Sequence, residues 1–165
     1  MEIRETIFIR APVSTVWRVF TDIENWDTWN TVCKACRLEE GRALEQGACI
    51  SFSLSPLIFP LRIAPVVEER REKKTIVWSG GKWGIHARHA FFFRKAGDNG
   101  KWTELESIEV FSGPLLWAAR LIGMHRRLHR LTLRLLEAIR EAAEDSAAGD
   151  DESARAKNAE ADSGR

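Results

Sequence analysis

The sequence contains no tyrosine, only three cysteines and no apolar run long enough for a membrane-spanning helix. A span of that kind needs roughly 18 or more consecutive apolar residues. The first ten residues, MEIRETIFIR, alternate charged and apolar side chains, whereas a signal peptide needs a continuous apolar run. Three cysteines leave at least one thiol without a disulfide partner, which fits a reducing compartment. Together these absences predict a cytoplasmic protein.

A large excess of charge of either sign is also absent, since the formal net charge is only +1. Residues 145–165 carry six acidic and three basic side chains, so the preceding part of the chain has a net charge of +4. That charge is too small to indicate a nucleic-acid partner. The chain lacks the GxSxG, Walker and dinucleotide glycine motifs, which argues against the common hydrolases, NTPases and dehydrogenases. No cofactor is predicted.

The chain does have the apolar mass for one domain, with 44% hydrophobic residues that include seven tryptophans and eight phenylalanines. We assign this domain to residues 1–144. The remaining residues, 145–165, contain no aromatic residue and no Leu, Ile or Val. Such a segment cannot bury enough apolar surface to fold alone, so a disordered polar tail is predicted.

Alternation of apolar and polar residues predicts seven strands joined by short links, which favours antiparallel pairing. Two short helices are expected after the first strand, the first opening at Pro12 and the second running towards Trp26. A long amphipathic helix is predicted from Pro114 to Glu144, with Gly123 either bending it or separating a first short helix. The pattern predicts an α+β fold with strands at 2–10, 32–40, 47–55, 60–71, 74–80, 84–95 and 101–111.

This order of elements resembles the helix-grip fold of the START-like and Bet v 1-like (SRPBCC) superfamily, in particular its polyketide cyclase/dehydrase branch. That fold is a seven-stranded curved antiparallel sheet wrapped around a long C-terminal helix. The similarity extends to sequence motifs over most of residues 3–140. They are APVSTVW (11–17), DIENWDTW (22–29), IVWSG (76–80), GIHARHAFFF (84–93) and TELESIEVFSG (103–113).

The resemblance implies a cavity between the sheet and the long helix, in which a small hydrophobic molecule or lipid binds. Strand alternation then predicts which side chains face that cavity. A wall this aromatic suits a flat or hydrophobic ligand, although the same residues could instead pack a solid core. The predicted ligand-binding residues are Phe52, Leu54, Leu61, Ile63, Trp78, His89, Phe91, Phe93, Leu105, Glu109, Phe111, Leu121, Met124 and Leu128.

Two polar residues, His89 and Glu109, share the parity of this inner face. A partly buried His and Glu pair can be tuned towards neutral pKa, so they are candidates for orienting a polar ligand group or transferring a proton. The alternative is that neighbouring backbone groups, Arg88 or water satisfy them.

No metal site is predicted. Cys33 and Cys36 match a CxxC spacing, but side chains three apart on a strand point to opposite faces, and only a turn at Lys34 and Ala35 would bring them together. His125 and His129 could share a helix face, yet two histidines without a nearby helical carboxylate are too few for a metal.

The predicted helix is strongly basic, with six arginines and one glutamate between Arg120 and Arg140. A solvated polar face explains this charge, and transient contact with an anionic membrane or a protein is the alternative. Three functions stay open: binding of a hydrophobic ligand, a polyketide-cyclase-like enzyme acting in the cavity, or a protein-interaction module with a filled core. The module would use the basic helix or the segment Trp26 to Trp29 as its surface.

Overall fold

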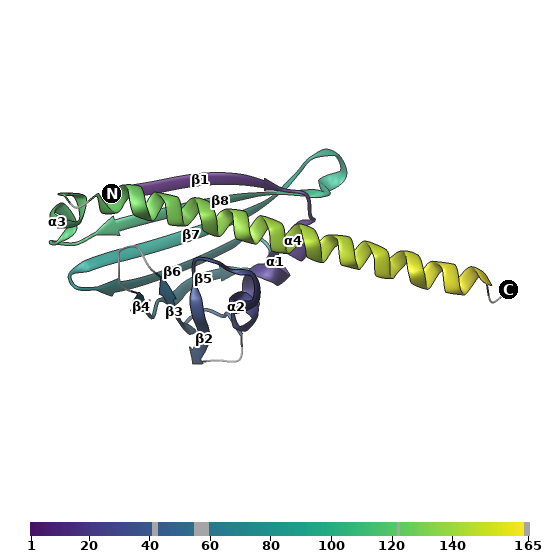
Figure 1. Cartoon of the computed structure of the whole chain (residues 1–165), viewed down its shortest axis with the longest axis horizontal. Coiled ribbons are helices and arrows are strands. Elements are labelled where there is room, and N and C mark those ends of the chain that lie inside the picture. Colours follow the sequence, from purple (N-terminus) through teal and green to yellow (C-terminus); the bar gives the residue numbers. More distant parts are fainter. Residues whose placement is uncertain (41–42, 55–59, 122, 164–165) are drawn as a thin grey trace.

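The computed structural model describes residues 1–40, 43–54, 60–121 and 123–163. The predicted order of a strand, small helices, further strands and a long helix is confirmed (Figure 1). Residue 55 of the third predicted strand and the last two residues of the predicted tail lie outside the described residues. The elements are β1 (Glu2–Ile9), α1 (Val13–Thr21), η1 (Ile23–Asn25), α2 (Trp26–Trp29), β2 (Lys34–Glu40), β3 (Cys49–Leu54), β4 (Leu61–Ile63), β5 (Val66–Arg71), β6 (Thr75–Lys82), β7 (Ile85–Ala96), η2 (Asp98–Gly100), β8 (Trp102–Ser112), α3 (Leu116–Leu121) and α4 (Met124–Ser163).

A curved antiparallel sheet forms one layer of the fold (Figure 1). Seven strands follow one another in the order β1-β8-β7-β6-β5-β3-β2, and the short β4 pairs with β3 beside this path. The strand predicted over residues 60–71 is therefore two strands, β4 and β5, separated at Ala64 and Pro65. Proline has no N–H to donate to a ladder. The carbonyl of Pro65 accepts a hydrogen bond from the Ile50 amide at 3.0 Å, which holds the break against β3.

Helix α4 lies along the sheet and packs mainly against β1 and α1. Its middle section supplies the most deeply buried side chains of the helix, which are Thr132, Leu135, Leu136, Ala138, Ile139 and Ala143. The first turns of the helix are less enclosed, since Met124 and Leu128 are only half-buried. None of the helices in the described residues is long and apolar enough to span a membrane.

Gly123 separates the two C-terminal helices. This is one of the two alternatives predicted from the sequence, the other being a bend in a single helix. Its φ of +71° is a left-handed conformation that ends α3 before α4 begins. The other end of α4 differs from the prediction, because residues 145–163 continue the helix where a disordered tail was expected. Alanine, glutamate, arginine and lysine form helices readily even where they cannot form a core. Arg18 Nη2 contacts Asp150 Oδ2 at 2.5 Å, so contacts with the domain extend beyond residue 144.

An aromatic cluster forms the core beneath α1. Phe20, on α1, is fully buried and contacts four other rings. Its centroid lies 4.7 Å from Phe91, 5.3 Å from Phe93, 5.5 Å from Trp26 and 5.7 Å from Trp78. The short helices therefore close one end of the concave face of the sheet with aromatic side chains.

At the opposite end of the sheet, α3 is fixed against the turn between β6 and β7. Gly113 precedes α3 with a φ of +119°, and a Cβ atom added there would overlap the carbonyl oxygen of Gly84 in that turn. Only glycine adopts this conformation without strain and allows this close approach.

Replacing Gly113 with alanine is therefore expected to destabilise the protein by about 2–4 kcal/mol, because it combines a backbone clash with an unfavourable φ. Urea denaturation measures the loss. Gly149→Ala is the matched control, since nothing lies within 4 Å of its added Cβ atom and it is within α4. This control should stabilise by up to about 1 kcal/mol. Equal stability of the two variants would contradict the close packing described for Gly113.

Candidate functional site

The two polar residues predicted to face inward lie side by side on the concave face. In the register of β7 and β8, His89 is directly opposite Glu109. The row continues to Trp78 on β6 and to Ile3 on β1. A polar pair therefore occupies the middle of an otherwise apolar row that crosses four strands.

His89 is held in place by three neighbours. Its Nε2 lies 2.7 Å from Ser107 Oγ, and its ring stacks on Phe91 with centroids 4.1 Å apart. Trp78 meets the imidazole edge-on at 5.9 Å. These contacts leave His89 only 7% exposed and fix the direction of its Nδ1 atom.

Glu109 has no such partners among the described residues. Its Oε1 is 3.7 Å from His89 Nδ1, which is too far for a hydrogen bond. None of the hydrogen bonds between described residues reaches this carboxyl group, although its side chain is only 18% exposed. The carboxyl group is thus largely removed from bulk water and keeps its hydrogen-bonding capacity for another molecule.

Burial moves the pKa values of the pair in opposite directions. It lowers the pKa of His89 to about 3 and raises the pKa of Glu109 to about 8, because each charged form is poorly solvated. Near neutral pH, Glu109 is then mostly a carboxylic acid and His89 is a neutral imidazole. Of the two titrating protons, the pair then holds only the one on Glu109, and it has no net charge.

The segment after α2 brings one thiol, that of Cys33, near Glu109. Cys33 and Cys36 are both buried in the same core, which corrects the expectation that they point to opposite faces. The reason is an irregular register between β2 and β3 around Ala35, whose φ is +53°. Burial raises the pKa of the Cys33 thiol, and the nearby Cys36 and Glu109 raise it further. Burial and the nearby Asp27 also raise the pKa of the Cys36 thiol, so both thiols are protonated at neutral pH.

Asn30 holds the start of this segment through its side chain. Its Oδ1 accepts hydrogen bonds from the backbone amides of Val32 at 2.8 Å and Cys33 at 2.9 Å. Its Nδ2 is buried and has no hydrogen-bond partner within the part of the chain that the structure describes. Asn30 was not predicted as a site residue, because nothing in its sequence context distinguishes it from a turn residue.

A second polar pair next to Ser107 was also missed. Glu5 on β1 is directly opposite Ser107, and its Oε1 lies 2.6 Å from Nε2 of His129 on α4. The sequence does contain a signal for Glu5, which shares the parity of the apolar residues Ile3 and Ile7. Polar groups thus run from α4 across β1 and β8 to His89.

The predicted ligand-binding residues divide into two groups. Seven of the fourteen are buried, and three of these, Trp78, Phe91 and Phe93, belong to the aromatic cluster around Phe20. The second group is only half-buried, on the inner face of the sheet and the first turns of α4. It comprises Leu54, Leu61, Ile63, Glu109, Met124 and Leu128.

Leu121 is apart from both groups. It is 78% exposed on α3, because the break at Gly123 takes it out of the buried stripe of α4. The buried residues Phe52, Leu105 and Phe111 occupy inner-face positions as predicted.

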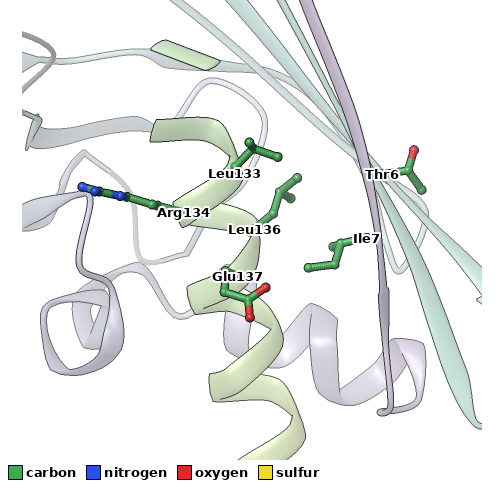
Figure 2. A pocket seen from close by; sticks show the side chains of 6 residues that line it. All are labelled: Thr6, Ile7, Leu133, Arg134, Leu136 and Glu137. Carbon is green, nitrogen blue, oxygen red and sulfur yellow. The ribbon is translucent and has the colours of Figure 1, made fainter. Parts of the chain in front are cut away.

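Two surface pockets lie outside the predicted set. A pocket of about 330 Å³ runs between β1 and α4 and is lined by Thr6, Ile7, Leu133, Arg134, Leu136 and Glu137 (Figure 2). A second, of about 390 Å³, is lined by Phe8, Arg10, Trp102, Arg140 and Glu144. Neither contains a predicted ligand-binding residue. Among the described residues, no group of three or more His, Cys, Asp or Glu side chains is arranged to hold a metal ion.

Comparison with known proteins agrees with this architecture. An aromatase/cyclase, Zhui from Streptomyces sp. R1128, superimposes with a TM-score of 0.72 at 14% identity, covering 87% of this chain and 93% of that one. A START superfamily protein from Mycobacterium smegmatis gives 0.66 at 16% identity, covering 90% and 97%. TTHA0849 from Thermus thermophilus gives 0.73 at 12% identity, covering 87% and 97%. At these identities the likeness shows the fold alone, and it confirms the predicted helix-grip architecture.

No curated protein matches the sequence. A family model does, and its description is polyketide cyclase/dehydrase and lipid transport. The match covers residues 1–142, which is the whole sheet and most of the packed part of α4. The resemblance inferred from the sequence motifs is confirmed. The chain therefore belongs to the polyketide cyclase/dehydrase and lipid transport family.

Proposed function

We propose that the protein binds a small hydrophobic molecule or lipid on the concave face of its sheet, with a polar group of that molecule at Glu109. The observation that carries the proposal is the largely buried carboxyl group of Glu109, which makes no hydrogen bond to a described residue. The side chain is 18% exposed and its oxygens still reach solvent, since Asn30 Nδ2 is the only fully enclosed side-chain N or O atom without a partner among the described residues. A ligand that covers Glu109 must therefore replace water as its hydrogen-bond partner, because leaving the carboxyl group without one would cost about 1–3 kcal/mol.

The protonation state of Glu109 selects the chemistry of the polar group. A carboxylic acid donates one hydrogen bond and accepts others. A carbonyl or hydroxyl oxygen on the ligand can therefore accept a hydrogen bond from the carboxylic acid of Glu109. A ligand carboxylate would gain no cationic partner from the neighbouring His89, which is neutral near neutral pH.

The apolar part of the ligand is expected to lie against the half-buried group of inner-face residues. Leu54, Ile63, Met124 and Leu128 keep part of their surface accessible, whereas the aromatic cluster under α1 is closed. Ligand pockets are typically apolar walls with a few placed polar groups. In this proposal Glu109 on β8 is the placed polar group, and Leu54 and Ile63, four strands away in the order of the sheet, supply part of the apolar wall.

A second candidate function is catalysis by proton transfer within the same site. It is favoured by the separation of 3.7 Å between His89 Nδ1 and Glu109 Oε1, across a pair that holds one proton. A ligand carbonyl beside Glu109 could receive that proton while His89 takes one from an adjacent carbon. Such a pair would assist cyclisation of a ligand already folded by the apolar wall.

Native mass spectrometry of the purified protein, followed by denaturing extraction, tests the proposal. We expect a bound apolar molecule that contains a carbonyl or hydroxyl oxygen. Glu109→Leu should weaken its affinity by about tenfold, the worth of one buried hydrogen bond. Glu104→Leu is the matched control, because Glu104 is on the same strand but bonds outward to Arg94 at 2.8 Å.

Two results would contradict the proposal. One is a protein that carries no ligand and takes up no apolar fluorescent probe. The other is equal ligand affinity in the Glu109→Leu and Glu104→Leu variants. Conversion of the extracted molecule by the wild type, abolished in His89→Ala and Glu109→Gln variants, would favour the catalytic function over simple binding.

A further inference from the structure

A group of large apolar side chains is exposed at the end of the molecule opposite the aromatic cluster. They come from the turn between β6 and β7 and from α3 with the residue before it. Trp83 is 70% exposed, Trp117 65%, Leu121 78% and Leu115 47%. We call these four residues the apolar tip. Folded proteins seldom leave several such residues together in water without a use for them.

The two parts of the apolar tip are in contact. The Leu115 side chain lies about 3.5 Å from the position of a Cβ atom built on Gly84, in the turn that contains Trp83. Gly113 and Gly84 bring their backbones close together at the same point. The turn and α3 are therefore one surface, at the left end of the view in Figure 1.

Trp83 occupies a position that tryptophan does not favour. The turn between Lys82 and Ile85 has two residues, and both have positive φ, +51° at Trp83 and +70° at Gly84. Asparagine and glycine suit such turns, whereas a bulky side chain in this conformation is strained. Strain of this kind is usually found at functional positions. The exposed indole is thus not explained by the fold of the turn.

The charged side chains of the segments that form the apolar tip and the start of α4 are basic, although Arg88 is paired with Glu68 at 2.7 Å. Residues 80–88 contain two basic and no acidic side chains, and residues 113–134 contain five basic and none acidic. Arg126, Arg127 and Arg130 are exposed on the first turns of α4. Lys82 lies 5.4 Å from the Trp83 ring centroid. Tryptophan and leucine flanked by Lys and Arg are the side chains that enter the headgroup region of anionic bilayers.

We propose that the apolar tip docks the protein onto an anionic lipid surface. Trp83, Trp117 and Leu121 enter the headgroup region, while the arginines at the start of α4 contact lipid phosphates. A second copy of this chain is a poorer occupant, because a symmetric contact would bring the exposed basic side chains of both copies close together, namely Lys82, Arg126, Arg127 and Arg130. The inference does not depend on the proposed ligand, since it rests on surface residues outside the Glu109 site.

Co-sedimentation of the full chain with vesicles tests this docking. Vesicles of phosphatidylcholine alone are compared with vesicles that contain about one-third phosphatidylglycerol. We expect binding to the anionic vesicles, at least about tenfold weaker binding to the neutral ones, and release as salt shortens the Debye length. The Arg126→Gln and Arg127→Gln double variant should bind about 25-fold less tightly, or about fivefold per arginine.

Trp83→Asn is the sharpest variant, because asparagine tolerates the positive φ of the turn and should not disturb folding. We expect Trp83→Asn and Trp117→Ser each to weaken vesicle binding by about tenfold, the effect of withdrawing part of one indole from the interface. Trp102→Ser is the matched control. Trp102 is also exposed, at the start of β8 near the other end of the sheet, and its loss should change binding by less than about twofold.

Three results would overturn the inference. The first is no binding to vesicles of either composition, and the second is binding that Trp83→Asn and Trp117→Ser leave unchanged. The third is self-association of the wild type that both variants abolish while vesicle binding persists in them, which would assign the apolar tip to a protein contact. Loss of vesicle binding in a Glu109→Leu variant is not expected, and this separates the docking surface from the ligand site.

Discussion

A Glu109→Gln variant is expected to be more stable than the wild type above about pH 7, by about 1–3 kcal/mol. Folding raises the pKa of Glu109 from 4.5 to about 8 because the charged carboxylate is buried. Between those pH values the unfolded chain releases a proton that the folded chain retains. Glu109 by itself therefore lowers the stability as pH rises through this range, and glutamine, which does not ionise, removes that loss.

The titration of His89 has the opposite effect on stability, at lower pH. Burial lowers its pKa from 6.5 to about 3, so protonation of the unfolded chain reduces stability as pH falls below 6.5. Between pH 4.5 and 6.5 the two effects cancel, since folded and unfolded chains each hold one proton on this pair. The wild type should show a plateau there, a rise in stability from pH 3 to 4.5 and a fall from 6.5 to 8.

Urea denaturation at a series of pH values measures these profiles. The stability of the Glu109→Gln variant should rise with pH up to about 6.5. It should not fall above that pH, as the stability of the wild type does. Glu104→Gln serves as the control, because this outward-facing residue is 31% exposed and paired with Arg94. Parallel profiles for the wild type and Glu109→Gln between pH 6 and 9 would show that Glu109 is not buried as described.

A Phe20→Ala variant is expected to lose about 3–5 kcal/mol of stability, the typical cost of deleting a fully buried phenylalanine ring. Phe20 touches four aromatic rings from α2, β6 and β7, and its side chain has no exposed surface. The cavity left behind is walled by rings that cannot collapse into it without moving strands. Such a loss is a large fraction of the total stability of a domain.

The matched control for this variant is Phe8→Ala. Phe8 is on β1 but is 54% exposed, so its loss should cost less than about 1 kcal/mol. Chemical denaturation of both variants makes the comparison. If Phe20→Ala cost no more than Phe8→Ala, α1 would not close the concave face with a packed aromatic core, and the division between core and ligand wall would be wrong.

Much of the fold follows from local signals in the sequence. Pro12 marks the start of α1, strand alternation marks the hairpins of β6, β7 and β8, and Gly123 marks the break before α4. The parity rule also placed His89 and Glu109 on one face, where the structure has them opposite each other. These features could be predicted because each depends on a few neighbouring residues.

Other features depend on contacts that a single sequence does not reveal. The irregular register at Ala35 turns Cys33 and Cys36 into the same core, although strict alternation separates them. Leu121 was placed in the α4 stripe although Gly123 marks a possible break, and residues 145–163 form a helix although they lack core-forming side chains. The contact between Arg18 on α1 and Asp150 is not visible in the sequence. Glu5 was missed although its parity indicated an inward position, because its partner His129 is more than a hundred residues away.

In the proposed function, Glu109 is a largely buried acid that receives the polar group of a hydrophobic ligand. Carboxyl-carbon NMR of the protein labelled with ¹³C-glutamate tests it directly, by following the Glu109 signal from pH 4 to 9 without and with the extracted ligand or an apolar probe. We expect a midpoint near pH 8 in the empty protein and a higher midpoint with ligand, because the ligand excludes the remaining water. A midpoint near 4.5, or one that ligand does not move, would contradict the claim.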